Sequence, residues 1–142
     1  MNLPTMKKTR ALTSNKNNTR RGAAVAELAV CLPMFLLVLT ATLDICGMFY
    51  VQQTLKISAY EGARVGIVPE SESENVVFQC ENLLDAQGVK GYSIVLDPPD
   101  PQTLTVGDYF TVTVEADYAQ NAIAGSLYPG KLLTKSVTLR VE

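Results

Sequence analysis

One long apolar stretch near the N-terminus constrains this chain more than any other feature. Residues 23–51 read AAVAELAVCLPMFLLVLTATLDICGMFYV, in which Glu27 and Asp44 are the only charged residues. The 16 residues between these two acids are uncharged and mostly apolar, and with the flanking apolar turns they reach the roughly 20 residues that span a bilayer. The stretch therefore predicts a transmembrane helix over residues 23–51, kinked or loosened near Pro33.

The charge distribution predicts how that helix crosses the membrane. Residues 1–22 contain six basic residues and no acidic residue, whereas the other 120 residues hold 6 basic and 14 acidic ones and have a formal charge of −8. Because lysine and arginine stay on the cytoplasmic side of a span, we expect a cytoplasmic N-terminus and an extracytoplasmic C-terminus. Residues 1–22 are interpreted as a basic leader, disordered over residues 1–19. Nucleic-acid binding by this leader is disfavoured, since it contains no aromatic residue and adjoins no folded motif.

The helical pattern continues past the apolar stretch. Residues 52–68 lack proline and stay rich in helix formers, so we expect one helix from Ala23 to about Gly66, roughly 65 Å long at 1.5 Å per residue. That is about twice the thickness of a bilayer core, so the outer half must pack on a globular domain or on other subunits. The residues that suit such a packed surface are Val51, Leu55, Ile57, Ser58, Ala59, Gly62 and Ala63.

Residues 69–142 predict a small extracytoplasmic domain. A second helix is expected over residues 73–87, with Ser71 or Ser73 as its N-cap and Gly88 at its end. Alternating apolar residues predict strands at 92–96, 109–118 and 132–141, with a weaker pairing segment at 104–106. The fold class is therefore α+β: a long N-terminal transmembrane helix, extending into a domain of one short helix and a three- to four-stranded antiparallel sheet. The apolar faces expected in this domain are Val76, Val77, Cys80, Leu83 and Leu84 on the helix, Phe110, Val112, Val114 and Ala116 on one strand, and Leu133, Lys135, Val137, Leu139 and Val141 on the last.

The junction between leader and apolar stretch has the features of a protease site. Residues 20–27 read RRGAAVAE, and prepilin peptidases cut on the cytoplasmic face after a small residue that precedes an apolar helix. Gly22 provides an unhindered backbone, so cleavage is expected between Gly22 and Ala23. An ordinary secretory signal would need a shorter apolar core and an A-x-A-like site, which this sequence lacks. An uncleaved signal anchor is the alternative interpretation.

Glu27 would become the fifth residue of the processed chain. A carboxylate at the start of a membrane helix is costly unless it is paired. Glu27 could complement the helix dipole and the new amine of Ala23, in its own chain or in a neighbour, and so select a docking register between subunits. The alternative is that Glu27 lies among the lipid headgroups.

Residues 20–64, RRGAAVAELAVCLPMFLLVLTATLDICGMFYVQQTLKISAYEGAR, resemble the TadE-like proteins of tight-adherence (Flp) pilus systems. The features that carry the resemblance are Gly22, Glu27, Pro33, Asp44, Gly47 and the run Glu61-Gly62-Ala63-Arg64. Tyr60 stands where arginine is common, and Asp44 where glutamate is common. The closing segment SVTLRVE is also similar to the usual family ending. The resemblance implies a pseudopilin that a prepilin peptidase cuts, that lies in the inner membrane, and that contributes to assembling the Flp fibre.

Several further residues are candidates for contacts along the helix. Asp44 would lie near the outer membrane interface, either at a solvated edge or in a contact between subunits. Glu61 and Arg64 are three residues apart and can form a local ion pair or a docking contact. Gly47, Gly62 and Gly66 could permit close approach of another helix, although scattered glycines often only loosen a helix.

An enzyme is not expected from this sequence. It contains no histidine, no nucleophile motif and no glycine-rich phosphate loop. Asp97, Asp100 and Asp108 could surround calcium, but in DPPDP and GD settings they more often form turns. Three cysteines without CxxC spacing indicate neither a metal site nor a disulfide framework, so we expect no cofactor.

The function expected is that of a minor pilin in assembly of a tight-adherence pilus and in surface adhesion. It would act in the bacterial inner membrane as a single-pass protein, with the prepilin peptidase, other pilins, the assembly machinery and the lipid bilayer as partners. No nucleic acid and no small-molecule substrate are expected. The alternative is a signal-anchored extracytoplasmic binding module unrelated to pili. Whether the protein enters the fibre, caps its tip or stays in the membrane is left open.

Overall fold

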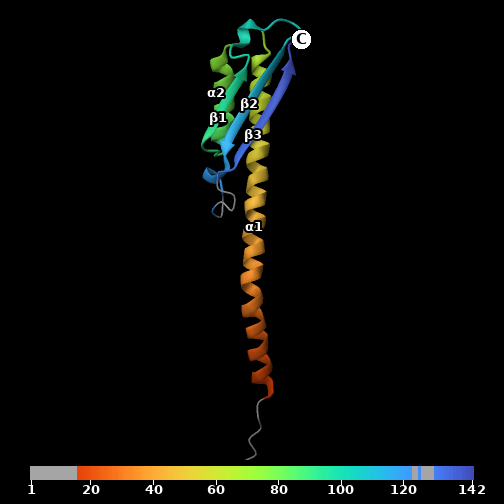
Figure 1. Ribbon diagram of the computed structural model, residues 1–142, viewed down its shortest axis with the longest axis vertical. Coiled ribbons are helices and arrows are strands. Elements are labelled where there is room, and N and C mark those ends of the chain that lie inside the picture. Colours follow the sequence, from red (N-terminus) through yellow and green to blue (C-terminus); the bar gives the residue numbers. More distant parts are fainter. Residues whose placement is uncertain (1–15, 123–124, 126–129) are drawn as a thin grey trace, which may run out of the picture. The chain divides into compact units, whose positions relative to one another are not determined.

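The computed structural model describes residues 16–122, 125 and 130–142, with side chains from Gly22 onward. The helices are α1 (Lys16–Gly66) and α2 (Ser73–Ala86), and the strands are β1 (Tyr92–Asp97), β2 (Tyr109–Asp117) and β3 (Leu132–Arg140), as Figure 1 shows. Two short 3-10 turns, Pro101–Thr103 and Tyr118–Gln120, precede and follow β2. The α+β fold class predicted from the sequence is confirmed, with three strands in the sheet.

The chain divides into two compact units, residues 1–38 and residues 39–142. In the first unit, the described residues are all helical and belong to α1. Residues 16–19 are part of this helix, so the prediction of disorder is wrong for them; residues 1–15 lie outside the described residues. The helix can begin early because no proline lies between Lys16 and Pro33, and Pro33 itself does not break it.

Helix α1 ends where the sequence predicts. Its last residue is Gly66, three residues before Pro69. Proline restricts the backbone of the residue before it and cannot donate a helical hydrogen bond. The chain therefore leaves the helix at this point and turns back toward α2.

Helix α2 ends in a Schellman motif at the predicted glycine. Gly88 has φ of 71°, its N–H donates to the carbonyl of Asp85 (3.0 Å), and the N–H of Val89 donates to the carbonyl of Leu84 (2.9 Å). The N-cap prediction is wrong: Glu72 occupies that position without a side-chain capping bond, because Ser73 is already helical and Ser71 lies outside.

The sheet has the order β1-β2-β3, and both pairings are antiparallel. Tyr92 pairs with Ala116 and Asp117 pairs with Leu132. The weaker strand predicted at 104–106 is wrong, because this segment forms a turn. The N–H and the hydroxyl of Thr105 donate to the carboxylate of Asp108, at 2.9 and 2.7 Å, and hold the backbone away from the sheet.

One face of the sheet packs on both helices and forms the core. The buried side chains of α1 and α2 recur every four residues, as expected for one face of a helix. Ile57, which the sequence grouped with this packed surface, is 55% exposed and lies on the opposite side of α1. The buried residues are Val51, Leu55, Ala59 and Ala63 on α1, Val76, Cys80 and Leu84 on α2, and Phe110, Val112, Val114 and Ala116 on β2, together with Val89, Tyr118 and Leu133.

Candidate functional site: the exposed and buried faces of the long helix

The predicted processing site lies within the described part of α1. Gly22 is exposed, and a Cβ placed on it would meet nothing within 4 Å. Ala23 and Ala24 are exposed as well. The peptide after Gly22 is therefore free of packing from the rest of its unit, as a protease substrate requires.

The most apolar part of α1 is not covered by any part of the chain that the structure describes. The candidate membrane span begins at Gly22, its most apolar window has a mean hydropathy of 2.2, and none of that window is buried. Leu28 is 62% exposed and Phe35 is 66% exposed. An apolar surface of this extent requires lipid or other apolar helices around it. The helix could cross a membrane, in accordance with a single-pass protein.

Glu27 lies on this uncovered helix. Its side chain is exposed and makes no ion pair with any side chain that the structure describes. The carboxylate is one helical turn from Ala23, since residues four apart share a face. Its predicted pairing partner, the amine released at Ala23, would come into being upon cleavage.

Asp44 is buried in the second unit. It is 1% exposed, and its backbone carbonyl accepts a hydrogen bond of 2.5 Å from the hydroxyl of Tyr118. Burial, and secondarily the charge of Asp44, raise the pKa of Tyr118. The expectation of a solvated membrane edge at Asp44 is therefore wrong, because α1 already packs against its own domain here. Tyr118 directly follows β2 and continues its buried alternation two residues after Ala116, so the predicted strand 109–118 included this residue but did not indicate its bond to Asp44.

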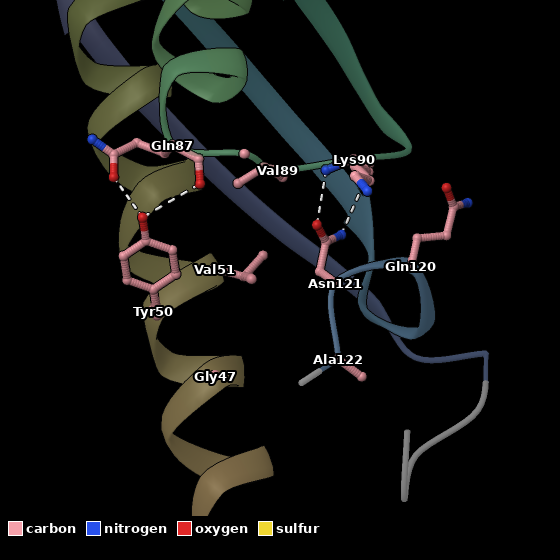
Figure 2. A pocket seen from close by; sticks show the side chains of 10 residues that line it. Gly47, Tyr50, Val51, Gln87, Val89, Lys90, Gln120, Asn121 and Ala122 are labelled. Carbon is pink, nitrogen blue, oxygen red and sulfur yellow. Dashed lines mark hydrogen bonds between the residues drawn. The ribbon is translucent and has the colours of Figure 1, made fainter. Parts of the chain in front are cut away.

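Gly47 lies beside a shallow pocket of about 300 Å³ in the same unit (Figure 2). The polar groups that line it are hydrogen-bonded to each other. The hydroxyl of Tyr50 donates to the side-chain oxygen of Gln87 (2.5 Å). The side chain of Asn121 accepts a bond from the N–H of Lys90 and donates one to its carbonyl, both of 2.8 Å. Among the described lining residues, Tyr50 and Lys90 are the ionisable ones. Its lining residues are Gly47, Tyr50, Val51, Gln87, Gly88, Val89, Lys90, Gln120, Asn121 and Ala122.

Gly62 lies where α1 crosses α2. A Cβ at this position would lie 2.3 Å from Sγ of Cys80. Ser58 and Cys80 exchange hydrogen bonds across the same crossing: the hydroxyl donates to the Cys80 carbonyl (3.2 Å), and the thiol donates to the Ser58 carbonyl (3.4 Å). Burial raises the pKa of the Cys80 thiol. The close helix approach at Gly62 is thus a contact within the chain.

Glu61 and Arg64 form a surface pair. The nearest nitrogen and oxygen are 4.0 Å apart, with side-chain exposures of 70% for Arg64 and 35% for Glu61. Pairs this exposed contribute about 0–1 kcal/mol. The charges of both residues stay available to a partner.

Of the aspartates weighed as calcium ligands, Asp97 ends strand β1, and the other two act in turns. Asp100 accepts from the N–H of Gln102 (3.0 Å), and Asp108 accepts the two bonds from Thr105 described above. These bonds lower the pKa of Asp108. Within the described residues, no group of three or more His, Cys, Asp or Glu side chains could hold a metal ion.

Comparison with known proteins connects the uncovered helix to a family. The family model described as TadE-like protein matches residues 22–64. This is the family predicted from the sequence, and the match begins at the predicted processing glycine and ends at Arg64. No curated protein and no solved structure matches the chain. The match covers less than half of the chain, and the TadE-like family suggests involvement in the tight-adherence pilus system.

Proposed function

We propose that this TadE-like chain is a minor pilin of a tight-adherence pilus, held in the bacterial inner membrane and processed between Gly22 and Ala23. The observation that carries the proposal is the wholly exposed apolar helix, which directly follows a basic leader. Such a helix is suited to two environments in turn, the bilayer and a bundle of other pilin helices. Its role would be to contribute to assembly of the fibre and thereby to surface adhesion.

The length of the uncovered helix supports the membrane location. Asp44 is the first residue of α1 beyond Gly22 that is fully buried in the domain, and residues 23–43 are exposed apart from the half-buried Ala41. At 1.5 Å per residue this run is about 30 Å long, equal to the hydrocarbon thickness of a bilayer. The span proposed here is thus shorter at its outer end than the span predicted to Val51. The basic leader favours a cytoplasmic N-terminus.

Processing at Gly22 requires the scissile peptide to leave the helix. Glycine in a helix interior is less stable than alanine by about 1 kcal/mol, so α1 is weakened at the bond that the peptidase would cut. The absence of any packing contact at Gly22 lowers the cost further. We therefore assign Gly22 and Ala23 as the prepilin peptidase site.

Glu27 would act after cleavage. In the apolar environment of the membrane, its carboxylate is unfavourable until a positive charge neutralises it. The Ala23 amine of the same or a neighbouring chain provides that charge, and the helix dipole adds to it. A pairing between chains would set the axial register of one subunit against the next.

The proposal is tested by the intact mass and N-terminal sequence of the protein extracted from its own membranes. A chain that begins at Ala23 in a strain with the prepilin peptidase, and at Met1 in a strain without it, supports the proposal. The Gly22→Val variant should keep its leader in both strains, whereas the matched Ala26→Val variant should be processed normally. A wild-type chain that keeps its leader in both strains contradicts the proposal and favours the signal-anchored binding module.

A further inference from the structure

The two edges of the folded domain carry opposite charge. From residue 70 to residue 100, a segment that contains α2 and β1, the chain has seven acidic residues and one basic residue, Lys90. From residue 131 to residue 140, a segment that contains β3, it has three basic residues and no acidic one. Because the strand order is β1-β2-β3 and α2 lies on the β1 side (Figure 1), these segments lie at opposite edges of the domain.

The acidic edge presents an aromatic side chain between carboxylates. Glu74, Phe78, Glu81 and Asp85 recur at intervals of three and four residues and so share one face of α2. Phe78 is 63% exposed, which is unusual for an aromatic ring in a domain with a core available to it. Asp85 is engaged by the hydroxyl of Tyr92 (2.9 Å), which leaves Glu74 and Glu81 as the charged flanks of Phe78.

The basic edge contains a groove between α1 and β3. Its walls are Phe49, Gln52, Gln53 and Lys56 of α1 and Lys135 of β3, and its volume is about 230 Å³. Phe49 is 59% exposed and lies at this groove. Two ammonium groups line the groove and no carboxylate does. Neither lysine forms a salt bridge with a described side chain, so an incoming acidic group would be stabilised by both.

We propose that the α2 face of one copy of this chain docks into the α1–β3 groove of a second copy. Phe78 of one copy would cover Phe49 of the next, while Glu74 and Glu81 would pair with Lys56 and Lys135. The two surfaces are opposite in charge, and each presents an exposed aromatic ring. Complementary charge of this kind fixes which faces meet and in which orientation.

This contact joins two different faces, so it does not close on itself as a two-fold dimer does. A heterologous contact repeated from copy to copy generates a ring or an open helical array. The contact deepens the proposed function by naming a second copy of the chain as the partner. It rests on that function only in that the contact is placed in a pilus. The contact itself does not depend on cleavage at Gly22.

The test is photo-crosslinking of the full chain in its native membranes, with p-benzoyl-phenylalanine in place of Phe49. The expected product is an adduct of two copies, joined between the groove of one and residues 74–85 of the other. The Lys56→Glu/Lys135→Glu variant and the Glu74→Lys/Glu81→Lys variant should each lower the adduct yield by about tenfold, a change of about 1.4 kcal/mol. Lys90→Glu is the control, since Lys90 is an exposed lysine outside the groove, and its adduct yield should equal that of the wild type.

Co-expression of the two reversed variants, each with a different tag, keeps the test independent of folding. The acidic groove of the first variant then meets the basic α2 face of the second, and the basic groove of the second meets the acidic α2 face of the first. The mixed adduct should therefore form, although each variant alone gives little adduct. An adduct to a different protein at Phe49, or a yield unaffected by charge reversal, overturns the inference. The mass of the monomer on the same gel reports processing, so failure of the contact and failure of the proposed function are distinguished.

Discussion

Residues 23–43 and residues 44–66 belong to the same helix, yet they differ in how much of their surface is buried. The first stretch is mostly apolar, with Glu27 as its one charged residue, and none of its most apolar window is buried by the described residues. The second stretch buries one face, built from Val51, Leu55, Ala59 and Ala63, against the sheet and α2. A helix that is apolar all round needs an apolar solvent, whereas a helix with one apolar face needs a partner surface. Stability of the first stretch therefore depends on membrane or neighbours, and that of the second on the fold of residues 39–142.

The same comparison explains where the small residues lie. In the second stretch, Gly62 and Gly66 are positions at which a Cβ would overlap Cys80 and the ring of Phe110, respectively. Gly22, which directly precedes the first stretch, has open space around it. Glycine therefore permits close packing at one end of the helix and weakens the backbone at the other.

The largest expected effect compares two identical truncations on α1. Leu55→Ala should destabilise the domain by about 2–5 kcal/mol, because Leu55 is 0% exposed. Leu28→Ala should leave the same transition unchanged, since Leu28 is 62% exposed and belongs to the other unit. The measurement is urea unfolding of the full chain in detergent micelles, followed by near-ultraviolet circular dichroism of the tyrosines, all of which lie after residue 49. Equal losses in both variants would show that the two stretches unfold together.

The next effect concerns the glycines. Gly62→Ala should cost about 1–3 kcal/mol by overpacking, because its Cβ would lie 2.3 Å from Sγ of Cys80. Gly22→Ala should not change the unfolding of the domain. The double variant Gly62→Ala/Cys80→Ala should recover part of the loss, which a double-mutant cycle measures. Additive losses would argue that the thiol and the glycine do not contact each other.

A smaller effect is expected at the point where α1 enters the domain. Tyr118→Phe removes the donor to the Asp44 carbonyl and should cost about 0.5–1.5 kcal/mol. Tyr109→Phe is the control, since Tyr109 is 65% exposed. Hydrogen exchange of the amides of residues 40–48 should also become faster in Tyr118→Phe. Unchanged exchange there would indicate that packing alone holds this end of the helix.

The smallest effect is expected for the surface pair. Arg64→Ala should change the free energy of unfolding by less than about 0.5 kcal/mol, and by less still in 1 M salt, because the pair is exposed. Unfolding curves at low and high salt provide the measurement. A loss above about 1 kcal/mol in Arg64→Ala would mean that Arg64 contributes to the fold through more than this pair.

Local sequence pattern predicted the regular elements well and the connections poorly. The end of α1, the extent and final glycine of α2, and the three strands follow from periodicity and from helix-ending residues. Ser71 and Ser73 did not cap α2, because a cap depends on which residue first takes helical backbone angles. Residues 104–106 did not pair with a strand, because the N–H and hydroxyl of Thr105 donate to the nearby carboxylate of Asp108 instead.

The sequence by itself determined the long apolar helix, the basic character of residues 1–22 and the match of residues 22–64 to the TadE-like family model. A bilayer is a uniform apolar solvent of fixed thickness, so composition and length along one segment suffice to predict a span. The tertiary structure alone decided that Asp44 is buried beneath Tyr118, that Gly62 faces Cys80, and that Ile57 points outward while Leu55 points inward. These outcomes depend on which residues, distant along the chain, meet when the sheet closes on the helices, and no single segment contains that information.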